Sequence, residues 1–161
     1  MIITRKIRMV MIQGALRQML CNKIMSITFI NQVSGTARIP KAVLLGLFKR
    51  TQKLYKKKIR EKSISVIFVS ENESKKLNSK YRNKAYATNV LSFESFSNDE
   101  LGDIIICPAV ARKQAKDMDV GFVWWLSFLF THGLLHLIGF DHKTKKQEIK
   151  MDDLTKKIIC E

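Results

Sequence analysis

The chain has 161 residues, of which 46% are hydrophobic, so it can build one compact domain with its own core and is not intrinsically disordered. Its formal net charge of +15, from 29 Lys and Arg against 14 Asp and Glu, favours a polyanionic partner such as nucleic acid over a merely solvated Lys-rich surface. No apolar run reaches transmembrane length, and three widely spaced cysteines without a CxxC pair exclude a thiolate zinc site and indicate a reducing cytoplasm.

Residues 1–24 carry several basic residues and no acidic one, and we interpret them as an N-terminal extension to a domain formed by residues 25–161. Two alternatives stay open for this extension. It is a basic, disordered arm, or it is a wrongly assigned start, with Met25 as the true first residue. Recognisable strand and helix patterning begins at Ser26.

The first half of the remaining chain predicts two strands, each followed by a helix. Ser26–Asn31 and Ser63–Ser70 are rich in β-branched and aromatic residues, as strands are. The last serine of the second strand forms a capping-box signature with Glu73, which predicts a helix to about Tyr81. Pro40 begins the earlier helix. Its predicted apolar face consists of Val43, Leu44, Leu47, Phe48, Thr51, Leu54 and Tyr55.

The second half predicts two strands and then three helices. The strands are Thr88–Phe93 and Leu101–Cys107, and the helices cover residues 108–118, 123–138 and 144–160. The order β-α-β-α-β-β-α-α-α predicts a single α+β domain with one mixed sheet of about four strands.

All three histidines lie in the segment His132-Gly-Leu-Leu-His136-Leu-Ile-Gly-Phe-Asp-His142. His132 and His136 share one face of the predicted buried helix, and Gly139 permits a reversal that returns His142 towards them. Three imidazoles suit zinc and leave a fourth position open, as in catalytic sites. We therefore predict one zinc ion per chain, on the buried helix and the turn after it. The alternative is that the histidines only cap and pack a buried helix.

Two neighbours of these histidines bear on the chemistry. The spacing H-x-x-x-H-x-x-G-x-x-H equals that of the metzincin peptidases, whose general-base Glu follows the first His. Gly133 occupies that position, which argues against a peptidase. Two interpretations of Asp141 stay open: it orients a ligand ring, or it is an ordinary turn residue.

The histidine segment resembles the signature HGxLHLxGYDH of the YbeY endoribonuclease family, with Phe140 in place of Tyr. Residues 77–82 (LNSKYR) with 88–93 (TNVLSF), and residues 101–104 (LGDI), resemble two further blocks of that family in the same order. Four departures lie outside the histidine block: Ala85, Ala87 and Glu94 stand where the family usually has Asp, Pro and Pro, and Thr155 stands where Glu is frequent.

The resemblance implies a cytoplasmic zinc-dependent hydrolase that cleaves single-stranded RNA. It further implies maturation of the 3′ end of small-subunit (16S) ribosomal RNA, ribosome quality control and contact with the small ribosomal subunit. We expect a monomer without a membrane partner. The alternative is a non-catalytic ribosome assembly factor that uses zinc for stability.

Arg82 and His136 are the predicted catalytic residues. The planar Arg82 guanidinium can contact two phosphate oxygens, and His136 is the middle metal ligand. Either metal-activated water or the RNA 2′-hydroxyl can be the nucleophile. Trp124 and Trp125 suit core packing better than base stacking. The residues predicted to contact the RNA backbone are Lys75, Lys76, Lys80, Lys84, Lys143 and Lys146.

Overall fold

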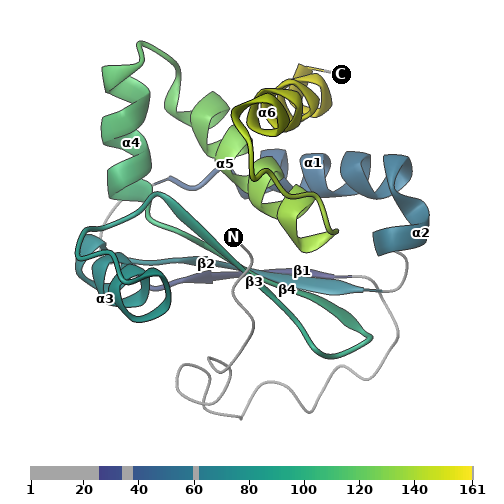
Figure 1. Ribbon diagram of the computed structural model, residues 1–161, viewed down its shortest axis with the longest axis horizontal. Coiled ribbons are helices and arrows are strands. Elements are labelled where there is room, and N and C mark those ends of the chain that lie inside the picture. The colour runs from purple at the N-terminus through teal and green to yellow at the C-terminus, as the bar shows by residue number, and fades with distance from the viewer. Residues whose placement is uncertain (1–25, 34–37, 60–61, 161) are drawn as a thin grey trace.

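The computed structural model describes residues 26–33, 38–59 and 62–160 (Figure 1). The predicted extension, residues 1–24, lies outside these described residues. Four strands form one mixed sheet in the order β1-β2-β4-β3, which confirms the predicted sheet. The strands β1, β2 and β4 run parallel, and β3 pairs antiparallel with β4 at one edge. Their bounds are Ile27–Asn31 for β1, Ser63–Phe68 for β2, Val90–Glu94 for β3 and Glu100–Ile106 for β4.

The helices of the described residues follow the predicted order with one addition, the short α2. Tyr55 interrupts the first predicted helix, and the chain resumes as α2. Within α1 the buried stripe is narrower than predicted, because Val43 and Leu54 lie at its flank and are 43% and 51% exposed. The bounds are Lys41–Leu54 for α1, Lys56–Ile59 for α2, Glu71–Arg82 for α3, Pro108–Asp117 for α4, Phe122–Leu137 for α5 and Lys145–Cys160 for α6.

The helices cover the two faces of the sheet unequally (Figure 1). The larger core lies on the side of α1, α5 and α6, and the smaller one packs α3 against the opposite face. Because side chains alternate along a strand, β3 serves both layers. Leu91 and Phe93 belong to the core under α3, whereas Val90 packs into the core under α5. This alternation directs the even-numbered residues of β3 towards α5.

A capping box fixes the start of the last helix. Helix α6 begins with a capping box, in which Thr144 Oγ1 accepts from the Gln147 amide and the Gln147 side chain accepts from the Thr144 amide.

Among the described residues, no single helix is long and apolar enough to cross a membrane. Helices α4 and α5 pass that test by length and composition only when taken together, and they are bent by 118°.

Candidate metal centre

The C-terminus of α5 carries a turn that organises the histidine segment. Gly139 has a φ of +90°, a conformation that glycine adopts without strain. The Gly139 amide donates to the His136 carbonyl at 2.9 Å, and the Phe140 amide donates to the Leu135 carbonyl at 3.0 Å. These two bonds form a Schellman motif, which ends the helix and reverses the chain. The reversal returns His142 towards the helix that carries the other two histidines.

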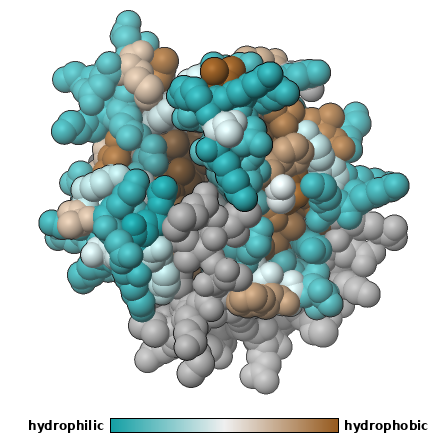
Figure 2. Space-filling model, in the orientation of Figure 1, coloured by the Kyte–Doolittle hydropathy of each residue, from teal (hydrophilic) through white to brown (hydrophobic). Residues whose placement is uncertain are grey.

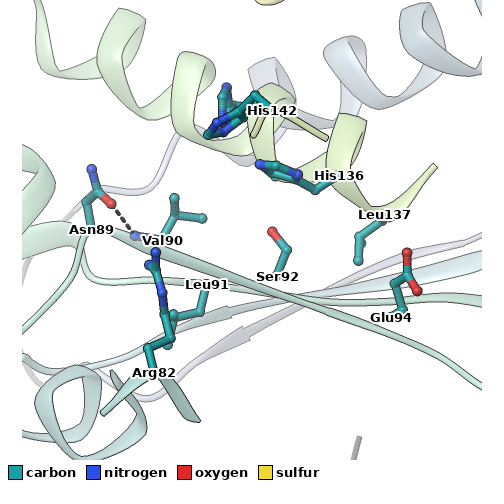
Figure 3. A pocket seen from close by; sticks show the side chains of 11 residues that line it. Arg82, Asn89, Val90, Leu91, Ser92, Glu94, His136, Leu137 and His142 are labelled. Atoms are coloured by element: carbon teal, nitrogen blue, oxygen red, sulfur yellow. Dashed lines mark hydrogen bonds between the residues drawn. The ribbon is translucent and has the colours of Figure 1, made fainter. Parts of the chain in front are cut away.

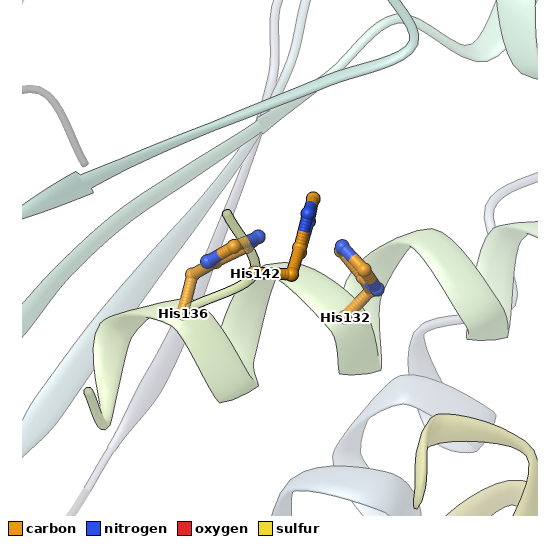
Figure 4. A group of neighbouring side chains, drawn as sticks. All are labelled: His132, His136 and His142. Carbon is orange, nitrogen blue, oxygen red and sulfur yellow. The ribbon is translucent and has the colours of Figure 1, made fainter. Parts of the chain in front are cut away.

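The three imidazole rings come together as the sequence predicts. One ligand atom from each of His132, His136 and His142 lies within 4.8 Å of the others. The ring centroids are 4.9 to 5.3 Å apart. Figure 4 shows the three side chains converging, two from α5 and one from the chain after it.

Hydrogen bonding sets the tautomer of His136. Its Nδ1 lies 3.0 Å from the Phe140 carbonyl oxygen. A carbonyl only accepts, so Nδ1 carries the proton and Nε2 keeps a free lone pair. The same turn that ends α5 therefore also prepares His136 as a ligand through Nε2.

Burial keeps two of the rings uncharged. Desolvation, and then repulsion from the neighbouring histidines, lowers the pKa of His132 to about 4. Desolvation and then His142 lower the pKa of His136 to about 4 as well. The Phe128 ring stacks on His132 with centroids 5.7 Å apart and supplies part of its apolar surroundings. Both rings are thus neutral at pH 7, the state that binds a metal.

Gly133 lies where helix α5 packs closely against the sheet. A Cβ atom at this position would lie 2.9 Å from Ser92 Oγ and 3.3 Å from Ile104 Cγ2. Strands β3 and β4 therefore approach α5 so closely that a side chain cannot be accommodated without a shift. Any residue larger than Gly at this position, including the Glu of a metzincin, would therefore require the Ser92 or Ile104 side chain to move.

The histidines form one wall of a cavity of about 210 Å³, and β3 forms the opposite wall. Arg82 and Asn89 lie at one end, Ser92 lies beneath His136, and Glu94 lies at the other end (Figure 3). The cavity thus joins the predicted ligands and the predicted phosphate contact, Arg82, in one site.

Arg82 is the last residue of α3, and the loop after it is fastened back onto that helix. The buried Asn78 donates from Nδ2 to the Tyr86 carbonyl at 2.8 Å. The buried Ser74 hydroxyl donates to the Thr88 carbonyl at 2.7 Å and accepts from the Thr88 amide at 2.9 Å. These bonds hold the loop without the Asp and Pro that Ala85 and Ala87 replace. Polar residues four apart beside the buried Leu77 are the sequence signal that could have identified this role.

The predicted RNA-binding lysines do not line the cavity. Lys75, Lys76 and Lys80 line a separate groove on α3, where Lys76 also pairs with Glu73 at 3.6 Å. Lys84, Lys143 and Lys146 are exposed. Figure 2 shows hydrophilic residues on the outer surfaces of α3 and α6. The lysines therefore lie outside the cavity, and the cation that lines it is Arg82.

Asp141, whose role the sequence left open, accepts the His142 amide at 2.8 Å. This bond lowers the pKa of the carboxyl and fixes the turn that carries His142.

The two tryptophans are half-buried and stack on each other and on Phe128. The Trp125 indole also donates to Gln114, whose Oε1 accepts from Asn89 at 2.8 Å, so this packing helps to hold one end of the cavity.

Two contacts with the histidine segment come from residues that sequence reasoning missed. Lys58 on α2 donates to the Ile138 carbonyl at 2.9 Å and lies over the Phe140 ring. The Asp152 carboxylate on α6 lies 3.5 Å from His132 Nδ1. Partial burial, and then Glu148, raises the pKa of Asp152. No local pattern marks either residue, because both reach the site from distant parts of the chain.

The donor set fits a divalent transition metal. Three imidazole nitrogens, two of them on rings held neutral at pH 7, are ligands that zinc prefers, and they leave a position for water or substrate. The orientation of His136 by a backbone carbonyl is typical of metal-binding histidines. His132, His136 and His142 are the residues that could hold the ion.

Comparison with known proteins adds independent information. The family model of endoribonuclease YbeY matches residues 29–161. Proteins of that name from Bdellovibrio bacteriovorus and Thermodesulfovibrio yellowstonii are 33% and 43% identical, over 62% and 60% of this chain. These matches span 66% and 64% of the two relatives, just under two thirds of their length. The Thermotoga maritima protein of that name is 33% identical over 74% of this chain and 80% of its own.

The fold has a solved counterpart. The solution structure of TM1509 from Thermotoga maritima superimposes with a TM-score of 0.58 and 30% identity, covering 83% of this chain and 87% of that one. The family match includes the strand pair, the α3 loop and the histidine turn that form the cavity. The chain belongs to the endoribonuclease YbeY family.

Proposed function

We propose that this protein is a metal-dependent endoribonuclease that cleaves phosphodiester bonds of single-stranded RNA. The observation that carries the proposal is the single cavity in which three convergent imidazoles face Arg82. A metal site and a fixed cation on one cavity suit phosphoryl chemistry, because negative charge develops on the phosphoryl oxygens in the transition state. The name of the relatives, endoribonuclease, supports RNA as the substrate.

Each wall of the cavity has a part in this proposal. His132, His136 and His142 hold the ion, which we propose to be one zinc per chain. Bound zinc would supply a Lewis acid and would lower the pKa of water towards neutrality. Arg82 binds and orients the phosphate and stabilises its developing charge. On the opposite wall, the Asn89 amide and the Ser92 hydroxyl can contact the sugar-phosphate backbone of the RNA.

The lysines outside the cavity give the protein its affinity for the strand. We propose that the α3 groove with Lys75, Lys76 and Lys80 guides the RNA backbone towards Arg82, which ends the same helix. Lys84, Lys143 and Lys146 contribute to the field around the entrance. Binding that depends on these cations weakens as salt rises, because phosphate contacts release counterions.

The family match supports a proposal for the biological substrate. We propose that the protein acts as a monomer in the cytoplasm on the 3′ end of small-subunit (16S) ribosomal RNA, in ribosome maturation and quality control, with the small subunit as its partner. The support is the family match together with the net charge of +15.

The test compares four proteins on one single-stranded RNA and its duplex, with cleavage, RNA affinity and zinc content measured for each. His136→Ala should lose metal and cleavage but keep much of its RNA affinity, because the lysines lie outside the cavity. Arg82→Ala should keep its metal, while its cleavage rate falls by about 10²- to 10³-fold. Lys84→Ala is the matched control, since it removes one positive charge from the same loop outside the cavity. It should lower RNA affinity but leave metal content and the cleavage rate at saturating RNA unchanged.

The outcomes separate this proposal from a non-catalytic assembly factor with structural zinc. Cleavage by His136→Ala at the wild-type rate would refute catalysis at this centre. Loss of folding and RNA binding together in that variant, with no cleavage by the wild type, would favour the assembly factor.

A further inference from the structure

His132 has one ring nitrogen that the three-histidine cluster does not use. Figure 4 shows one nitrogen of His132 directed towards the other two rings and one directed away from them. Nδ1 is buried and makes no hydrogen bond. The Asp152 carboxylate oxygen lies 3.5 Å from Nδ1. A buried imidazole N–H without a hydrogen-bond acceptor destabilises the folded protein, so a hydrogen bond from Nδ1 to this carboxylate would be favourable.

The position of Asp152 follows from how α6 is anchored. The capping box at Thr144 and Gln147 starts the helix two residues after His142. Two turns later Met151, Thr155 and Ile158 are buried at helical spacing, which fixes the rotation of α6. Asp152 follows the first of these buried residues and lies at the edge of the buried face, one-third exposed, whereas Asp153 is exposed.

We propose that Asp152 is a positioning residue of the metal centre, whose carboxylate accepts the Nδ1 proton of His132 and leaves Nε2 for the metal. This inference rests on the metal centre of the proposed function. The Phe140 carbonyl accepts the Nδ1 proton of His136 in the same way, at 3.0 Å. An acceptor behind a ligand histidine fixes the tautomer and the ring, and a carboxylate also makes the ligand more basic. The two histidines of α5 are then oriented by different elements, one by its own turn and one by α6.

The experiment measures zinc affinity by competition with a chelator for the wild type, Asp152→Ala, Asp152→Asn and Asp153→Ala. Loss of the outer carboxylate should weaken zinc binding of Asp152→Ala by about 10- to 100-fold. Asp152→Asn keeps an accepting oxygen without its charge and should lie between Asp152→Ala and the wild type. Asp153→Ala, the neighbouring exposed carboxylate, should bind zinc as the wild type does.

Three further measurements keep the result specific. The absorption spectrum of the Co²⁺-loaded protein should change in Asp152→Ala, because the His132 ring loses its fixed orientation. Thermal unfolding of the metal-free variants should stay close to wild type, which excludes a general loss of structure, and Asp152→Glu should recover part of the affinity.

The outcomes distinguish this inference from the proposed function. A wild-type protein that binds zinc, with Asp152→Ala equal to it in affinity and Co²⁺ spectrum, would overturn the role of Asp152 and leave the metal centre intact. Equal weakening by Asp153→Ala would also overturn it, since a general charge effect would then suffice. A wild-type protein that binds no divalent metal would instead refute the metal centre itself.

Discussion

Gly133→Ala tests how closely the sheet approaches helix α5, which carries His132 and His136. The added Cβ would lie 2.9 Å from Ser92 Oγ, closer than real Cβ atoms approach a neighbour, and 3.3 Å from Ile104 Cγ2, which is a tight contact. Overpacking of this kind costs about 1–3 kcal/mol. Ala also stabilises a helix interior by about 1 kcal/mol relative to Gly. The control is Gly46→Ala in α1, where a Cβ meets nothing within 4 Å, so that variant isolates the gain from helix propensity.

The assay is denaturant and thermal unfolding of the metal-free proteins. We expect Gly46→Ala to be more stable than wild type by up to about 1 kcal/mol. Gly133→Ala should then be less stable than Gly46→Ala by about 1–3 kcal/mol, which corresponds to roughly 2–4 °C per kcal/mol for a chain of this size. Adding Ser92→Ala, which removes the nearest atom, should recover part of the loss. Gly133→Ala as stable as Gly46→Ala would refute the close approach of β3 to α5.

Three further predictions concern electrostatics and domain limits. In the presence of a chelator, the free energy of unfolding should be highest above pH 6.5 and should fall towards pH 4. The reason is that the histidines of the unfolded chain protonate near pH 6.5, whereas His132 and His136 of the folded protein stay neutral down to about pH 4. A fall of equal size in His136→Gln would contradict this. Raising salt should weaken single-stranded RNA binding steeply, and an affinity independent of salt would exclude phosphate contacts. Deleting residues 1–24 should leave the melting temperature unchanged, and early melting or insolubility would show that they support the fold.

The histidine centre was largely predictable because its determinants are local. The four-residue spacing of His132 and His136 places them on one helix face, and Gly139 allows the turn that returns His142. The strand order β1-β2-β4-β3 was less accessible. Alternation of apolar residues predicts that strands exist, but pairing depends on contacts between distant segments. Helix α2 was missed, because its Lys-rich sequence continues the helical pattern of α1 without a break signal.

The sequence by itself determined the clustering of the three histidines, the reversal of the chain at Gly139 and the capping of α3 at Ser70, since each depends on hydrogen bonds and spacings within a few residues. Only the tertiary structure decided what surrounds the three histidines. Arg82 reaches the cavity because β3 crosses below α5 and α3 ends beside it, and Asp152 reaches His132 because α6 folds back over α5. Such contacts depend on the register and rotation of packed elements, which long-range burial sets and local sequence does not encode.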